Sequence, residues 1–245
     1  PDEAPGVYSL SGPDPSGARA LADYAWELGL ERVVVVRPAT EAAAVDAEAF
    51  QEAFRAVGGL VPREIVFDSG ATFFQPQFEE VSSILPDGLF LPLNPRDIEL
   101  LAPQVTYYGL DTLGIQLLGT AGWARDEVVV EVDSRHTDGV IAATTRTTQD
   151  ETEEFVAFRE AYEELFQKTL RSEVPAFGYD AAGLFLKALE AGPRSSQELQ
   201  EALEGIRDFP GATGRLTIER GRIMREPHLV RIQDHELIYI SSRYD

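Results

Sequence analysis

The residue types that usually carry catalysis are sparse and scattered in this chain. It has no cysteine, and its three histidines, His136, His228 and His235, do not follow the spacing of a metal-ligand motif. Its only lysines, Lys168 and Lys187, both fall on predicted helices, which disfavours a Schiff-base lysine. A nucleophile elbow, a phosphate-binding loop and a dinucleotide-binding glycine turn are all missing. We therefore expect no enzymatic activity, no metal and no cofactor.

Five polar or aromatic residues could instead contact a ligand, because they follow predicted strands. In a parallel α/β sheet, ligands lie at the carboxyl ends of the strands, where loops and helix amino ends converge. The candidates are Thr40, Glu41, Asn94, Thr120 and Trp123. An alternative stays open, in which Trp123 packs a hinge between lobes and the other four only cap helices.

The elements that would position these residues alternate between strand and helix. Apolar runs predict strands, and amphipathic stretches of period 3.6 predict helices. The predicted strands are 7–11, 32–36, 65–67, 88–93 and 115–118, with helices at 16–28, 42–57, 74–85 and 97–108. This alternation indicates right-handed crossovers and a parallel sheet covered on both faces.

The pattern changes after residue 139. Residues 140–147 read as a strand or extended crossover, followed by helices at 150–170, 179–191 and 195–206, a strand at 216–218 and a hairpin of 229–232 with 237–240. The three helices have apolar faces but almost no sheet of their own. We expect either a dimer or a partner segment to cover Phe155, Phe158, Leu165, Leu184 and Leu186.

Composition restricts the class of partner. The 245 residues carry 42 acidic and 21 basic side chains, a net charge of −21. Nucleic acid and anionic lipid both require a basic surface, so neither is an expected partner. The longest apolar runs, at 33–36 and 89–93, are too short to span a bilayer. The length suits one large domain or two small ones.

Seven segments, taken in order, resemble a known family. They are ALADYA at 20–25, LGLERV at 28–33, PDGLFL at 86–91, YGL at 108–110, LGTAGW at 118–123, FGYDA at 177–181 and GATGRLTIERG at 211–221. Together they resemble the type I periplasmic binding proteins, in particular the leucine/isoleucine/valine-binding branch. The resemblance covers nearly the whole chain, but only the later part of the family's length.

The resemblance implies an α/β fold with one three-layer, parallel-sheet lobe and a partial second lobe. Residues 7–142 with 226–245 would form the second, C-terminal lobe of the family. Residues 143–225 would form the returning part of the first lobe, whose opening half this sequence lacks. The implied role is non-enzymatic and periplasmic or extracytoplasmic, with a lipid anchor through the missing N-terminus. Its two lobes would close on an amino acid or another small polar ligand for an ABC transporter, with a membrane permease as partner.

Three positions depart from the family pattern. Residues 40–44 supply no aromatic where the family has a tyrosine that stacks on the ligand, and a second tyrosine aligns with Asn94. The glutamate that holds the ligand's amino group aligns with Ala121. A buried ammonium group without a counter-charge is costly, which disfavours an ordinary amino acid. Two alternatives therefore stay open: an interaction lipoprotein of the cell envelope, such as a penicillin-binding-protein activator, and the sensory ligand-binding domain of a receptor.

Overall fold

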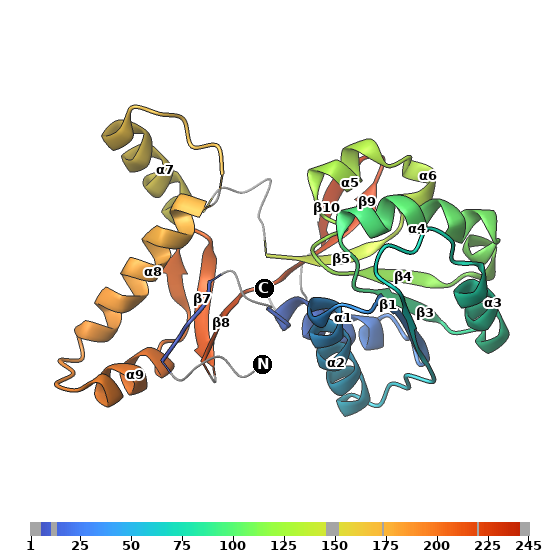
Figure 1. Cartoon of the computed structure of the whole chain (residues 1–245), viewed down its shortest axis with the longest axis horizontal. Coiled ribbons are helices and arrows are strands. Elements are labelled where there is room, and N and C mark those ends of the chain that lie inside the picture. The colour runs from blue at the N-terminus through green and yellow to red at the C-terminus, as the bar shows by residue number, and fades with distance from the viewer. Residues whose placement is uncertain (1–5, 11–13, 146–151, 173, 220, 241–245) are drawn as a thin grey trace. The chain divides into compact units, whose positions relative to one another are not determined.

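A computed structural model describes residues 6–10, 14–145, 152–172, 174–219 and 221–240 (Figure 1). The chain forms two compact units. Unit 1 comprises Pro1–Asp14 and Thr145–Glu226, and unit 2 comprises Pro15–Thr144 and Pro227–Asp245. The elements predicted at 7–11, 140–147 and 150–170 extend in part into residues outside the described ranges.

Unit 2 is built on a seven-stranded sheet in the order β10-β9-β5-β4-β3-β1-β2. Its strands are β1 Val33–Pro38, β2 Glu64–Phe67, β3 Gly88–Leu91, β4 Gln116–Gly119, β5 Ile141–Thr144, β9 His228–Gln233 and β10 Glu236–Ile240. The strands β1 to β5 pair in parallel, whereas β9 pairs antiparallel with β5 and with β10. The predicted, mostly parallel sheet is confirmed.

Helices cover both faces of this sheet because both faces of its central strands are apolar. Val33 and Val35 of β1 face one core cluster, and Val34 and Val36 face the other. The first cluster contains α1 Ser16–Glu27 and α2 Glu41–Ala56. The second contains α3 Gln75–Ile84, α4 Pro95–Tyr107 and α5 Asp126–Glu131, with α6 Ser134–Thr137 and the 3-10 helix η1 Leu110–Leu113 beside them (Figure 1).

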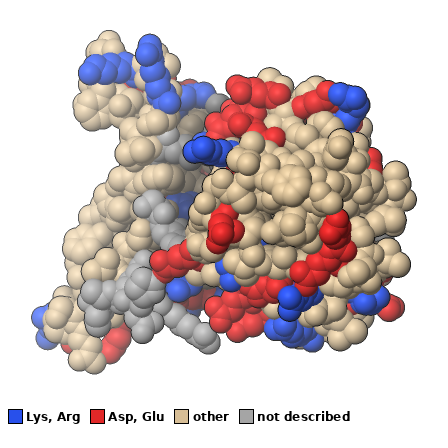
Figure 2. Space-filling model, turned by 45° about the vertical axis from the view of Figure 1, so that its right-hand side comes forward, with Lys and Arg blue, Asp and Glu red and all other residues tan. Residues whose placement is uncertain are grey.

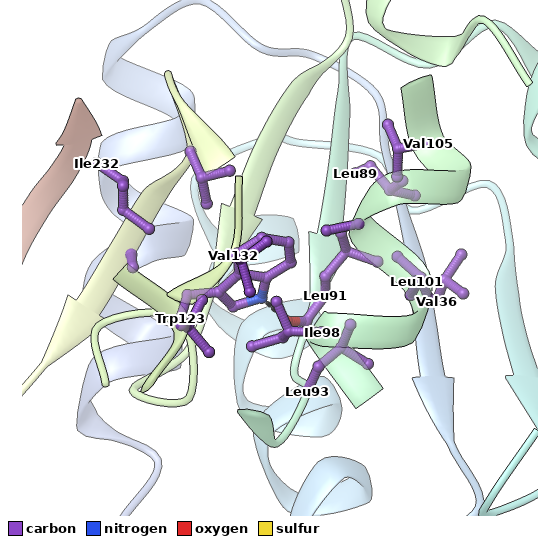
Figure 3. Packing of buried hydrophobic residues seen from close by; sticks show 14 of the residues in the cluster. Val36, Leu89, Leu91, Leu93, Ile98, Leu101, Val105, Trp123, Val132 and Ile232 are labelled. Atoms are coloured by element: carbon purple, nitrogen blue, oxygen red, sulfur yellow. Dashed lines mark hydrogen bonds between the residues drawn. The ribbon is translucent and has the colours of Figure 1, made fainter. Parts of the chain in front are cut away.

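Trp123 lies in the middle of the second cluster (Figure 3). Its side chain is fully buried, and its Nε1–H donates a hydrogen bond of 3.0 Å to the carbonyl oxygen of Leu91. Gly119 admits the indole, because a Cβ at that position would lie 2.2 Å from Trp123 Cδ1. The turn after β4 is thereby fastened to the end of β3.

In its described residues, unit 1 combines three helices with a small antiparallel sheet. The helices are α7 Glu153–Phe166, α8 Val174–Leu189 and α9 Ser196–Glu204, and the strands are β6 Phe209–Gly211, β7 Gly214–Glu219 and β8 Arg222–Arg225. Tyr8 and Leu10 pack against the core of this unit. Residues 7–10 therefore belong with unit 1 and not with the parallel-sheet lobe in which the sequence places them, because Tyr8 and Leu10 pack with the strands of the small sheet.

The packing within unit 1 also buries some of the apolar side chains for which a dimer or partner segment was expected. Phe158 and Leu184 are 6% and 2% exposed, since they pack inside unit 1. The expectation that these two require a partner is wrong. Leu165 and Leu186, at 75% and 62% exposed, remain on the surface. The sequence patterns revealed neither β6, which is only three residues long, nor the half-exposed β8.

Two leucines of η1 provide a matched test of the unit 2 core. Leu110 is 1% exposed and belongs to the second core cluster, whereas Leu113 is 45% exposed. We expect Leu110→Ala to lower the free energy of unfolding by about 2 to 4 kcal/mol through the cavity that it leaves. Leu113→Ala should change it by about 0.5 kcal/mol or less. Urea unfolding followed by far-UV circular dichroism measures both, and equal losses would contradict this assignment of the core.

Candidate functional site

The strand order of unit 2 marks one edge of its sheet as the place where a ligand is expected. Among the parallel strands the order is β2-β1-β3-β4-β5, so the chain reverses its direction of travel between β1 and β3. The loop after β1 leads to α2 on one face, and the loop after β3 leads to α4 on the other. In open α/β sheets, ligands bind at this switch point, beyond the carboxyl ends of the strands. Thr40, Glu41 and Asn94 follow these two strands.

Thr40 caps the amino end of α2. Its backbone is extended, and its Oγ1 accepts a hydrogen bond of 3.4 Å from the N–H of Ala43. The side chain is half-buried, and Glu41 beside it is exposed in the first helical turn. An N-cap hydroxyl accepts from the helix and still has its own hydrogen to donate. Thr40 can therefore cap α2 and contact a ligand at the same time.

Asn94 caps α4 in the same way and is exposed. Its Oδ1 accepts from the N–H of Asp97 at 3.0 Å, and its Nδ2 donates to Asp97 Oδ2 at 2.7 Å. Burial raises the pKa of Asp97, while the hydrogen bond from Asn94 and the charge of Arg96 act in the opposite direction. The side chain of Asn94 is thus held in one orientation, with one amide hydrogen left for a ligand.

The turn after β4 lies directly against the loop after β3. A Cβ on Gly122 would lie 2.1 Å from the carbonyl oxygen of Leu93 and 3.3 Å from Asn94 Cα, so only glycine allows this approach. The turn is closed by a hydrogen bond of 3.0 Å from the N–H of Trp123 to the carbonyl oxygen of Thr120. The structure thereby brings the Thr120 turn next to Asn94.

Trp123 differs from the other candidates. The structure places its side chain inside the core of unit 2, where it is fully buried in the second apolar cluster. Its side chain does not line the sheet edge, and it is not exposed to pack at a hinge between lobes. Its contribution is to hold the Thr120 turn through the hydrogen bond to Leu91. Gly119 and Gly122, which flank this turn, were the available signal for such close packing.

Arg37 is a charged residue near this edge that the sequence analysis did not consider. Its side chain is 16% exposed, and its Nε donates to Glu64 Oε1 at 2.6 Å. Burial tends to raise the pKa of Glu64, but hydrogen bonds from Gln51 and Arg37 outweigh it and lower the pKa. Because Glu64 remains ionised beside it, Arg37 is neutralised locally and brings little net charge to the edge.

The ionisable side chains elsewhere in the described residues do not form a metal site. In the described parts of the chain, no group of three or more His, Cys, Asp or Glu side chains is arranged to hold a metal ion. His136 contacts Thr106 Oγ1 through Nδ1, and His235, in the β9–β10 turn, contacts the carbonyl oxygen of Val129. None of the helices in those parts is both long enough and apolar enough to cross a membrane.

Comparison with solved structures shows the same fold in solute-binding proteins. A leucine-binding protein from Thermotoga maritima is 25% identical, with a TM-score of 0.71 over 93% of this chain. An ABC transporter substrate-binding protein from Sphaerobacter thermophilus is 24% identical, with a TM-score of 0.73 over 96%. An ABC transporter solute-binding protein from R. palustris, solved in complex with benzoate, is 20% identical, with a TM-score of 0.66 over 93%.

The chain spans only part of these proteins, namely 65%, 65% and 62% of their respective lengths. No curated protein matches the sequence significantly. The family model described as periplasmic binding protein matches residues 1–236, which is nearly the whole chain. The order of sequence motifs, the strand order of unit 2 and this match agree. The chain belongs to the periplasmic binding protein family.

Proposed function

We propose that this chain is a non-enzymatic solute-binding module of an ABC transporter that works outside the cytoplasm. The observation that carries the proposal is the family match over residues 1–236, on a fold shared with solute-binding proteins. Within unit 2, the ligand would contact Thr40, Glu41, Asn94 and Thr120 at the switch point of the sheet. A membrane permease would be the protein partner.

The chemistry of this edge favours a ligand with a carboxylate and no ammonium group. The hydroxyl groups of Thr40 and Thr120 and the amide of Asn94 are neutral donors, and the amino ends of α2 and α4 favour negative charge. Ala121, exposed in the turn after β4, offers no carboxylate to hold an ammonium. The one carboxylate among the four candidates, Glu41, lies in the first turn of α2, where the amino end of the helix already favours its negative charge. Among the structural relatives, one is named a leucine-binding protein and another was solved with benzoate. We infer that the ligand belongs with the organic acids.

Two ligands that differ in one group test this inference. Leucine and 4-methyl-2-oxopentanoate share a side chain and a carboxylate, but only leucine carries an ammonium group. We expect the keto acid or benzoate to stabilise the protein in differential scanning calorimetry, by about 2.7 kcal/mol at 100 times the dissociation constant. Stronger stabilisation by leucine would contradict the organic-acid assignment. The absence of any shift across a wider metabolite panel would argue against solute binding and in favour of a protein-interaction role.

Asn94 caps α4 and, in this proposal, also contacts the ligand. Substitution can separate these two roles. Asn94→Ser retains an acceptor for the N–H of Asp97 but removes the amide, so we expect little loss of stability and an affinity lower by about 5- to 10-fold. Asn94→Ala should lose affinity and also about 1 kcal/mol of stability.

Ser195, which caps α9 in unit 1 by accepting from the N–H of Glu198, supplies the control. Ser195→Ala should cost similar stability and leave the affinity unchanged. Isothermal titration with the best ligand of the panel measures the affinities. Equal affinities of the Asn94 variants and the parent protein would remove Asn94 from the site.

We also propose that the exposed side of α8 is covered in the assembled protein, by a second copy or by another polypeptide segment. Apolar side chains cover this side of α8 and the end of α7: Leu165, Phe166, Val174, Tyr179, Phe185, Leu186 and Leu189. The side chains of α8 include only two charges, the buried Asp180 and the exposed Lys187, and Figure 2 shows a largely uncharged surface at its left. A helix that is apolar all round is normally buried.

Sedimentation velocity tests this proposal. A dimer that dissociates when Leu186→Glu is introduced would identify a second copy as the cover. A monomer that binds the dye ANS strongly, and less strongly after Leu186→Glu, would indicate that another polypeptide segment covers the exposed side of α8. A monomer that binds no ANS would contradict the need for cover, and Lys187→Glu serves as the charge-matched control in both measurements.

A further inference from the structure

The main chain passes between the two units at three places, after residues 14, 144 and 226. We propose that Arg225 positions two of these three connections and so determines where the units bend relative to each other. The proposal rests on the proposed function only in that a solute-binding module must move its two units. The side-chain contacts of Arg225 that support it lie within unit 1.

Arg225 holds the first connection against the last one. Its backbone N–H donates to Asp14 Oδ2 at 2.8 Å, and its Nη2 donates to the carbonyl oxygen of Leu10 at 2.7 Å. These partners are more than 200 residues away in the sequence. The chain leaving unit 1 at Asp14 and the chain leaving it after β8 are therefore tied to each other through one residue, by its backbone N–H and by its side chain.

The guanidinium group of Arg225 is itself fixed from two further sides. Its Cζ lies 5.0 Å from the centroid of the Phe177 ring on α8, and its Nε donates to Thr213 Oγ1 at 3.2 Å. A planar, forked cation can stack on a ring and donate in its own plane at the same time, which a lysine ammonium cannot do. The contact set selects arginine at this position.

Asp180 completes the arrangement from inside unit 1. It is fully buried on α8 and accepts hydrogen bonds from the N–H of Ala212 at 2.6 Å, the N–H of Thr213 at 2.9 Å and Thr213 Oγ1 at 2.6 Å. The hydroxyl hydrogen of Thr213 points to Asp180, so its oxygen is free to accept from Arg225. Gly211 permits the approach, since a Cβ there would lie 2.9 Å from Asp180 Oδ2. Linked charge-assisted hydrogen bonds of this kind reinforce one another.

Both connections then enter unit 2 through a proline. Asp14 is followed by Pro15, and Glu226 by Pro227. Proline fixes its own φ angle and restricts the residue before it. With Leu10, Asp14 and Arg225 held on one side and a proline on the other, few backbone torsions remain free in either connection. In these two connections we therefore expect the bending to occur at the Asp14–Pro15 and Glu226–Pro227 steps.

The absence of cysteine from the sequence allows a direct test. Spin labels placed at Gln197→Cys, exposed on α9 of unit 1, and Glu52→Cys, exposed on α2 of unit 2, report the distance between the units in the ligand-free protein. We expect Arg225→Gln to broaden this distance distribution. Arg222→Gln, three residues earlier on β8 and exposed, is the matched control and should leave the distribution unchanged.

Hydrogen exchange provides a second readout. In Arg225→Gln the amide of residue 225 should lose about 10- to 100-fold of its protection, while the core strands of unit 2 keep theirs. Thr213→Val breaks the link between Arg225 and Asp180 with little change of shape, and should also broaden the distribution. It serves as the test if Arg225→Gln does not fold by circular dichroism.

An unchanged distance distribution in folded Arg225→Gln and Thr213→Val would overturn the proposal. A broadened distribution in the Arg222→Gln control would overturn it as well, because any change in β8 would then loosen the connections. These measurements use no ligand, so a failure of the metabolite panel counts against the proposed function alone.

Discussion

The structure of unit 2 depends on one constraint, the burial of a parallel sheet on both of its faces. The valines of β1 alternate between two apolar clusters, so helices must cover both sides. To supply both layers, the chain has to reverse its direction across the sheet, and it does so between β1 and β3. The separation of α2 from α4 at the sheet edge is a consequence of this burial. The same apolar pattern therefore determines both the core and the location of the candidate site.

Sequence reasoning succeeded where the local pattern and the tertiary environment agree. The valine run of β1 and the hairpin of β9 and β10, whose turn places Asp234 and His235 at positive φ, could be predicted from composition and spacing. The sequence pattern did not predict a strand whose extended shape depends only on pairing with its neighbour. β6 is Phe209–Gly211, with a proline and a glycine in three residues, and only its partner β7 makes it extended. Residues 7–10 were misassigned because an apolar run does not reveal which sheet will bury it.

The candidate site shows the same division. The positions of Thr40, Asn94 and Thr120 just after parallel strands could be predicted, because the end of such a strand is visible in the sequence and its place at the sheet edge follows from topology. Their contact with a ligand stays a prediction. The depth of a side chain below that edge is not visible. Trp123 is buried because Gly119 and Gly122 let the turn approach the indole and the backbone at Leu93. Such an approach depends on contacts between distant segments, such as Trp123 and Leu91, which are 32 residues apart, and spacing rules provide no signal for it.

The two units differ in how their order is maintained. Unit 2 has two large apolar clusters, one on each face of its sheet, whereas the clusters of unit 1 are small and one side of α8 remains exposed. In unit 1 the buried carboxylate of Asp180 accepts three hydrogen bonds and so helps to fix the positions of neighbouring segments. In unit 2 apolar packing fixes these positions. A polar network specifies one geometry, but it tolerates the loss of a member less well than an apolar core does. Because Phe177 and Asp180 both lie on α8, a partner bound to the exposed side of this helix would also stabilise the network around Arg225. Such binding would therefore be physically linked to the geometry of the connections to unit 2.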